Sequence, residues 1–155
     1  MVAPEFLNQF EPYAAFEKHL IGVSNIYQAE LYRNIFNIKG YGHKDIRTTD
    51  IKTAVMAKNV HNCHGAMKVA FFNEIYDVCE DEKISYREMM NCIFSMNNNV
   101  HPQYTQIGAD GRRGFGGACF PKDAVAMANE YEIETLGAAC QINRAWRPEE
   151  MKSVL

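Results

Sequence analysis

Residues 51–81 read IKTAVMAKNVHNCHGAMKVAFFNEIYDVCED, and this stretch decides the fold. It contains no proline and one glycine. A continuous helix over the stretch would be about 45 Å long, at 1.5 Å per residue. Several of its apolar residues recur near the helical period. They are Ala54, Ala57, Met67, Ala70, Phe71, Ile75 and Val78. This stripe must be buried against something, and a second copy of the chain is a natural candidate. We therefore predict a mainly α fold, a helical domain built around one long central helix.

Shorter elements are expected before this helix. Residues 19–23 form a short apolar run typical of a strand, and residues 25–37 show helical spacing. Residues 45–48 are typical of a second strand, which leads to a helix cap at Thr49 or Asp50. The sequence thus predicts two short residual strands near the N-terminus.

Further helices and one long loop are expected after it. The predicted helices are 86–96, 124–131 and 135–146. Ser85 is a plausible cap for the first of them. The composition of residues 97–117 is typical of a loop, and Pro148 stops or restarts the last helix. Five aromatic side chains are interpreted as core: Tyr13, Tyr27, Tyr32, Phe36 and Trp146.

Composition narrows the class of protein. The chain has 155 residues, of which 47% are hydrophobic and 23% charged, and its formal net charge is −3. This charge argues against a partner bound through nucleic-acid phosphates. No apolar run approaches the roughly 20 residues of a membrane span, so we expect no membrane partner. The five cysteines are irregularly spaced, which indicates reduced thiols and a cytoplasmic location.

Residues 114–123, GFGGACFPKD, contain one cysteine directly after a glycine-rich segment. Pro121 suits the first position of a helix, because its missing N–H leaves no donor unmet there. Cys119 then lies just before the helix, near unpaired N–H groups and the positive end of the helix dipole. Lys122 adds a cation. Both effects favour the thiolate, which is the nucleophilic form of cysteine.

This segment resembles the signature of the UDP-glucose/GDP-mannose dehydrogenase family. In that family the cysteine forms a thiohemiacetal and then a thioester during two NAD-dependent oxidations of a sugar C6 alcohol to a carboxylate. The resemblance implies a catalytic role for Cys119. It extends from Pro4 to about Trp146, so it covers most of the chain.

The resemblance implies partners for the cysteine. Lys58 and Asn62 are similar to the family's K-x-x-x-N on its long helix, where they stabilise developing negative charge as an oxyanion hole does. Their spacing makes them neighbours on one helix face. Asp123 ends the signature and orients water or relays a proton in the family. Glu5, in the P-E-F-L stretch, is linked there to substrate binding and thioester hydrolysis.

The remaining implied contacts are with substrate and cofactor. The residues implied to bind substrate are Phe6, Leu7, Phe115, Gly116 and Gly117. Lys122 contacts the NAD cofactor in the family. The chain has no G-x-G-x-x-G turn of the kind that binds dinucleotides, so we expect it to bind no NAD alone. We expect a homodimer through residues 51–81, and a separate NAD-binding chain or an intact dehydrogenase as a further partner.

Two domains are expected. Residues 1–48 would be the residual end of a cofactor-binding domain with a linker helix, and 49–155 the helical dimerisation and catalytic-cysteine domain. Residues 61–64, HNCH, could suggest zinc, but no further ligands complete a tetrahedral set, so we expect no metal.

Alternative functions remain open at this level. The chain has Gln9 where the family often has an acid, and no arginine occurs in residues 97–103, where the family carries one that crosses the dimer. A non-enzymatic dimerisation module that associates with or inhibits an intact dehydrogenase is therefore an alternative. A thiol-dependent hydrolase or aldehyde-handling protein is a further one. Arg112 and Arg113 could bind phosphate or simply solvate their loop.

Overall fold

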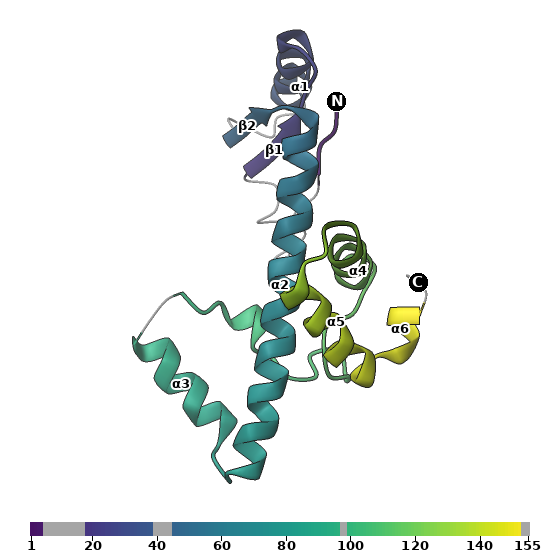
Figure 1. The fold of residues 1–155 in the computed structure, drawn as a ribbon. Coiled ribbons are helices and arrows are strands. Elements are labelled where there is room, and N and C mark those ends of the chain that lie inside the picture. The colour runs from purple at the N-terminus through teal and green to yellow at the C-terminus, as the bar shows by residue number, and fades with distance from the viewer. Residues whose placement is uncertain (5–17, 39–44, 97–98, 153–155) are drawn as a thin grey trace. The chain divides into compact units, whose positions relative to one another are not determined.

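In the computed structural model, the described residues are 1–4, 18–38, 45–96 and 99–152 (Figure 1). They form two compact units, Met1–Val60 and His61–Leu155, and each is described by itself. Six helices and two short strands make up the described part, so the predicted mainly α class is confirmed. The predicted domain boundary after residue 48 concerns function and stays a prediction.

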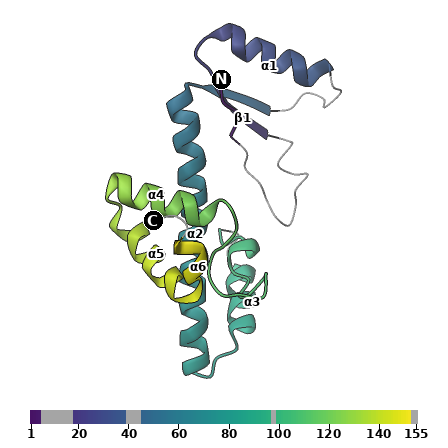
Figure 2. The same ribbon diagram turned by 90° about the vertical axis from the view of Figure 1, so that its right-hand side faces the viewer.

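The first unit contains a β-α-β arrangement (Figure 2). Strand β1 (Lys18–Gly22) pairs in parallel with β2 (Asp45–Thr49), and α1 (Ile26–Ile38) connects them. Parallel strands need such a crossover, because a tight hairpin joins only antiparallel ones. Both predicted strands and the predicted helix are confirmed, and no bound differs from its prediction by more than one residue.

Helix α1 presents most of its described apolar side chains to solvent. Ala29 is buried, whereas the following are exposed: Ile26, Tyr27, Leu31 and Ile35. The core interpretation of Tyr27 is therefore wrong, because 77% of this residue is exposed. Tyr32 is half-buried and its hydroxyl lies 3.3 Å from His19 Nδ1. Tyr13 and the side chain of Phe36 lie outside the described residues.

Helix α2 (Ile51–Asp81) has the predicted bounds. Its cap is Asp50, whose carboxylate accepts a hydrogen bond from Thr53 N at 3.0 Å. Residues 51–60 belong to the first unit and 61–81 to the second. At its end the chain reverses through Lys83, which has a positive φ of 58°.

Helix α3 (Tyr86–Met96) folds back beside the end of α2 (Figures 1 and 2). The Tyr76 and Tyr86 rings meet edge to face, with centroids 5.4 Å apart. The predicted cap is confirmed, since Glu88 N donates to Ser85 Oγ at 3.3 Å. The predicted loop that follows contains one short 3-10 turn, Pro102–Tyr104.

Three helices complete the second unit: α4 (Phe120–Tyr131), α5 (Glu134–Trp146) and α6 (Pro148–Lys152). Helix α4 begins earlier than the apolar pattern predicted, and Pro121 lies in its first turn as expected. Pro148 restarts the chain as a helix. Trp146 packs partly buried against the core, which confirms its interpretation.

The core of the second unit lies where α2, α4, α5 and α6 meet. Its buried members are Cys63, Ala66, Ala70, Phe115, Ala124, Val125, Met127, Leu136, Ala139, Cys140 and Met151. Close packing explains why residue 65 of α2 is a glycine. A Cβ there would lie 2.7 Å from the Phe120 ring, closer than real contacts allow. Glycine therefore lets the start of α4 pack directly on α2.

Candidate active site

Cys119 lies at the N-cap of α4, half-buried, with φ −104° and ψ −55°. Its side chain makes no capping hydrogen bond, and its carbonyl accepts from Asp123 N at 2.9 Å in the first helical turn. The sequence-based expectation that Cys119 lies at the start of a helix is thus confirmed. The N-terminus of a helix of this length favours nearby negative charge.

Asp123 is the buried carboxylate of this turn and is 4% exposed. Its Oδ2 accepts a hydrogen bond from Asn62 Nδ2 at 2.6 Å, and Asn62 is itself buried on α2. Its Oδ1 pairs with the ammonium group of Lys122, whose side chain is 60% exposed. This pairing raises the pKa of Lys122. A buried carboxylate needs such charge-assisted partners to offset its lost hydration.

Cys63 borders the same turn. Its thiol lies 3.6 Å from the Asp123 carbonyl oxygen, to which it donates. Burial raises the pKa of Cys63 to about 11, with a further contribution from Asp123. Cys63 is therefore held as a neutral thiol at physiological pH, which leaves Cys119 as the candidate nucleophile of this turn.

The structure brings together part of the predicted set. Asn62, Asp123, Lys122 and the backbone of Cys119 meet at the start of α4. Lys58 lies one helical turn before Asn62 on α2, within the first unit. Three predicted residues, Glu5, Phe6 and Leu7, lie outside the described residues. The catalytic and binding roles of all the predicted site residues stay predictions.

Residues 110–117, here called the glycine loop, precede Cys119 and are held in part by Asn143 of α5. Asn143 Oδ1 accepts from Phe115 N at 2.8 Å, and its Nδ2 donates to Phe115 O at 2.9 Å. The Phe115 side chain is buried in the core, which favours a structural role for it. Gly116 is half-buried and Gly117 is exposed. Gly114 has a φ of +78°, and a Cβ there would collide with the Asn143 side chain.

Arg113 belongs to an internal network, so it is paired rather than merely solvated, and its predicted binding of phosphate stays a prediction. Its guanidinium pairs with the Asp77 carboxylate and also donates to the side chain and carbonyl of Asn73. It stacks over the rings of Tyr76 and Trp146, with its Cζ 5.5 and 4.8 Å from their centroids. These contacts stabilise the loop by cation–π and charge-assisted bonds.

Arg112 is also paired rather than merely solvated, since its Nη1 lies 3.1 Å from Glu150 Oε1. Four residues that were not predicted from the sequence hold this loop: Asn73, Asn143, Arg147 and Glu150. Each is an ordinary polar residue in a helical pattern. No local motif marks any of them, because their partners lie about 30 residues or more away.

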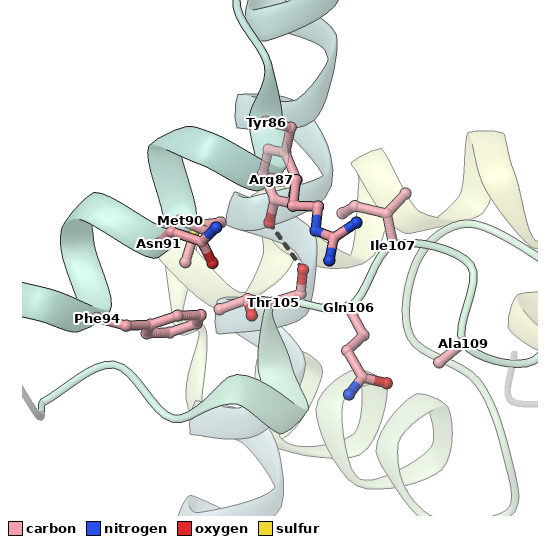
Figure 3. A pocket seen from close by; sticks show the side chains of 9 residues that line it. All are labelled: Tyr86, Arg87, Met90, Asn91, Phe94, Thr105, Gln106, Ile107 and Ala109. Atoms are coloured by element: carbon pink, nitrogen blue, oxygen red, sulfur yellow. Dashed lines mark hydrogen bonds between the residues drawn. The ribbon is translucent and has the colours of Figure 1, made fainter.

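A cavity of about 440 Å³ lies between α3 and residues 105–109 (Figure 3). Tyr86 closes one side, because its hydroxyl donates to Thr105 O at 2.8 Å and burial raises its pKa to about 12. Phe94 and the Arg87 guanidinium line other parts of it. None of the predicted site residues lines this cavity, so it does not extend the candidate active site.

Metal binding and membrane insertion are two further classes of function. Within residues 1–4, 18–38, 45–96 and 99–152, no group of three or more His, Cys, Asp or Glu could hold a metal ion. None of the described helices has the length and apolar character needed to cross a membrane.

Comparison with known proteins identifies the family. The model of the UDP-glucose/GDP-mannose dehydrogenase family, central domain, matches residues 52–147. The chain belongs to this family. The UDP-glucose 6-dehydrogenase of Rickettsia felis is 30% identical over 146 residues, which are 92% of this chain and 31% of that protein. UDP-glucose 6-dehydrogenase YwqF of Bacillus subtilis is 31% identical over 108 residues, 63% of this chain and 22% of the relative.

Solved structures agree on the fold of this family member. A UDP-glucose dehydrogenase from Pyrobaculum islandicum gives a TM-score of 0.74 at 19% identity, covering 92% of this chain and 33% of that one. A UDP-D-ManNAc dehydrogenase from Pyrococcus horikoshii gives 0.70 at 20% identity, with the same coverage. The chain therefore spans about a third of the length of the proteins it matches.

Proposed function

We propose that this chain carries the cysteine chemistry of a nucleotide-sugar 6-dehydrogenase of the UDP-glucose type. The observation that supports this most is the buried Asn62–Asp123 hydrogen bond of 2.6 Å, made one helical turn after Cys119. It couples the long helix to the start of α4. A thiol, an amide and a carboxylate then occur in one helical turn and the helix beside it.

The proposed step is addition of Cys119 Sγ to the aldehyde carbon derived from the sugar C6 alcohol. A C–S bond forms, the carbonyl π bond breaks, and its oxygen takes the electron pair. The Asn62 amide and the Lys58 ammonium stabilise that oxyanion, and Lys58 supplies its proton. After the carbon has been oxidised to a thioester, water attacks it. Asp123 accepts a proton from that water, and the carboxylate product leaves the free thiol.

The nicotinamide cofactor is included in this proposal only because the chain belongs to a dehydrogenase family. When bound, it supplies the acceptor for the hydride removed in each oxidation. The chain contains no G-x-G-x-x-G turn to hold a pyrophosphate, and Lys122 pairs with Asp123. These residues do not fit a complete cofactor site, so we derive no step through the cofactor. We place its binding on another segment or chain.

The first test is the reactivity of Cys119 in the chain itself. Limiting iodoacetamide is added at neutral pH, and alkylation of each cysteine is followed by mass spectrometry. Exposed Cys92 on α3 is the internal reference. We expect Cys119 to react faster than Cys92. Equal or slower reaction of Cys119 counts against the proposed nucleophile.

The second test adds cofactor-binding and nucleotide-binding segments. The chain is co-expressed with the cofactor-binding and nucleotide-binding segments of the Bacillus subtilis relative, and NADH absorbance is followed with UDP-glucose and NAD. We expect turnover that is lost in C119S and retained in R144Q, a change at an exposed arginine of α5. Turnover that survives in C119S contradicts the proposal.

We further propose that the chain forms a homodimer through α2. Phe71 and Val78 are seven residues apart on one face of the second unit and are 55% and 52% exposed. Burying such side chains favours association. Sedimentation velocity should give a dimer for the chain and a monomer for the F71D/V78D variant. A monomer at all concentrations for the unsubstituted chain rejects the homodimer.

A further inference from the structure

Arg147 is a buried cation at the end of α5, and its side chain is 3% exposed. Its Nη1 and Nη2 donate to the two Asp110 carboxylate oxygens at 2.8 and 2.6 Å. Nη1 also donates to Glu150 Oε1 at 2.9 Å. Each remaining donor reaches a main-chain carbonyl of the glycine loop, at Arg112 O (3.0 Å) and Arg113 O (2.7 Å). All five guanidinium donors therefore have acceptors.

Glu150 continues this network toward the cysteine. Its Oε1 accepts from Arg112 and Arg147, and its Oε2 accepts from Gly117 N at 2.9 Å. Gly117 lies two residues before Cys119. Glu150 thus connects the buried arginine to the last part of the loop before α4.

The loop backbone lies directly against this pair. A Cβ added at Gly116 would overlap both Arg147 Nη1 and Glu150 Oε2. Glycine-rich segments lose much conformational freedom when they are held in one conformation. A dense set of charge-assisted bonds to the backbone offsets that loss here.

We propose that Arg147 and Glu150 are positioning residues for Cys119. They hold residues 110–117 in the conformation that presents the Cys119 thiol at the start of α4, beside Lys122. The inference rests on the proposed function, which makes Cys119 the nucleophile. Glu150 lies beyond the residues matched by the family model, 52–147, so that match does not include it.

The test uses the full chain with E150A and a matched control, E149A. Both variants change a glutamate of α6 to alanine, but Glu149 pairs with the exposed Lys152 and is itself 76% exposed. Alkylation by iodoacetamide gives the ratio of the Cys119 rate to the Cys92 rate in one sample. We expect E150A to lower this ratio about tenfold, the effect of one charge-assisted hydrogen bond, and E149A to leave it unchanged.

This ratio separates positioning from stability. A purely structural role for Glu150 would lower the thermal midpoint and leave the ratio unchanged at temperatures well below that midpoint. An unchanged ratio in folded E150A therefore overturns the inference. If E150A does not fold, E150Q takes its place, because its amide oxygen still accepts from Gly117 N. E150Q should lower the ratio of the Cys119 rate to the Cys92 rate by less than E150A would, but by more than the scatter of the E149A measurements. An unchanged ratio in E150Q overturns the inference.

Failure of the proposed function gives a different result. In that case Cys119 reacts no faster than Cys92 in the unsubstituted chain. Hydrogen exchange at the Gly117 amide then decides the inference alone. Exchange that accelerates about tenfold in E150A supports a held loop, and equal exchange in E150A and E149A rejects it.

Discussion

Two charged side chains are buried in the second unit, and their partners differ in kind. Arg147 donates to two carboxylates and to two main-chain carbonyls of the glycine loop. The partners of the Asp123 side chain include two other side chains, the buried Asn62 and the largely exposed Lys122. Bonds to backbone carbonyls fix the path of the chain. Bonds among side chains can be exchanged for bonds to a substrate.

This difference separates two roles. A buried charge whose donors all have acceptors, two of them loop carbonyls, acts as a structural anchor, and its removal leaves those backbone acceptors without partners. For the buried carboxylate of Asp123, which lies next to an exposed lysine and one helical turn after a half-buried thiol, we propose a chemical role. We therefore expect substitutions at Arg147 to affect folding most, and those at Asp123 to affect reactivity most.

The largest effect on stability is expected for R147A. The change removes five hydrogen bonds and leaves the Arg112 and Arg113 carbonyls without their donor, so the free energy of unfolding should fall by about 2–4 kcal/mol. Urea unfolding measured by circular dichroism checks this. R144A, at an exposed arginine of the same helix, is the control and should change stability by less than about 0.5 kcal/mol. Equal losses in the two variants would refute the anchor role.

N143A should come next. Asn143 is fully buried and satisfies both the N–H and the C=O of Phe115. Alanine leaves two buried backbone groups unpaired, which should cost about 1–3 kcal/mol. The same urea titration measures it. N91A, at an exposed asparagine of α3, should unfold like the unsubstituted chain, and an equally unstable N91A would contradict this account.

A smaller effect is expected from acid. The hydrogen bond from Arg147 lowers the pKa of Asp110 below its ordinary value. The folded state therefore binds this proton less readily than the unfolded state does. The stabilisation is present above the unfolded pKa of about 3.9 and is lost as the pH falls through the lower folded value. Urea midpoints between pH 2 and 5 should fall more steeply for the unsubstituted chain than for D110N, and parallel profiles would contradict this linkage.

Most of the helical framework could be predicted because its signals are local. Helix α2 has the expected bounds, since thirty-one residues without proline follow a recognisable cap at Asp50. Ser85 and Asp50 act as caps through bonds to residues three positions along the chain. Such interactions are encoded within one helical turn. The position of Cys119 before α4 was predictable for the same reason.

The loop network could not be predicted, because its bonds join residues far apart in the sequence. Asp77 lies 36 residues before Arg113, and Asp110 lies 37 residues before Arg147. A local pattern contains no sign of either pair. Arg113 was therefore interpreted as a phosphate ligand or a solvated side chain, although it is held by Asp77 and Trp146. The core interpretation of Tyr27 is wrong for a related reason. Helical spacing shows which residues share a helix face, but it does not show whether another element packs on that face.

The smallest effect on stability is expected for D123N. The amide oxygen of asparagine can still accept from Asn62, and the lost pairing with Lys122 is worth little because that side chain is 60% exposed. The free energy of unfolding should change by less than about 1 kcal/mol. In the co-expressed enzyme, however, D123N should lose most of its turnover, because its side chain can no longer accept a proton from water. Arg147 and Asp123 share one kind of role if D123N is as unstable as R147A. They differ, as we propose, if D123N stays folded and turns over slowly.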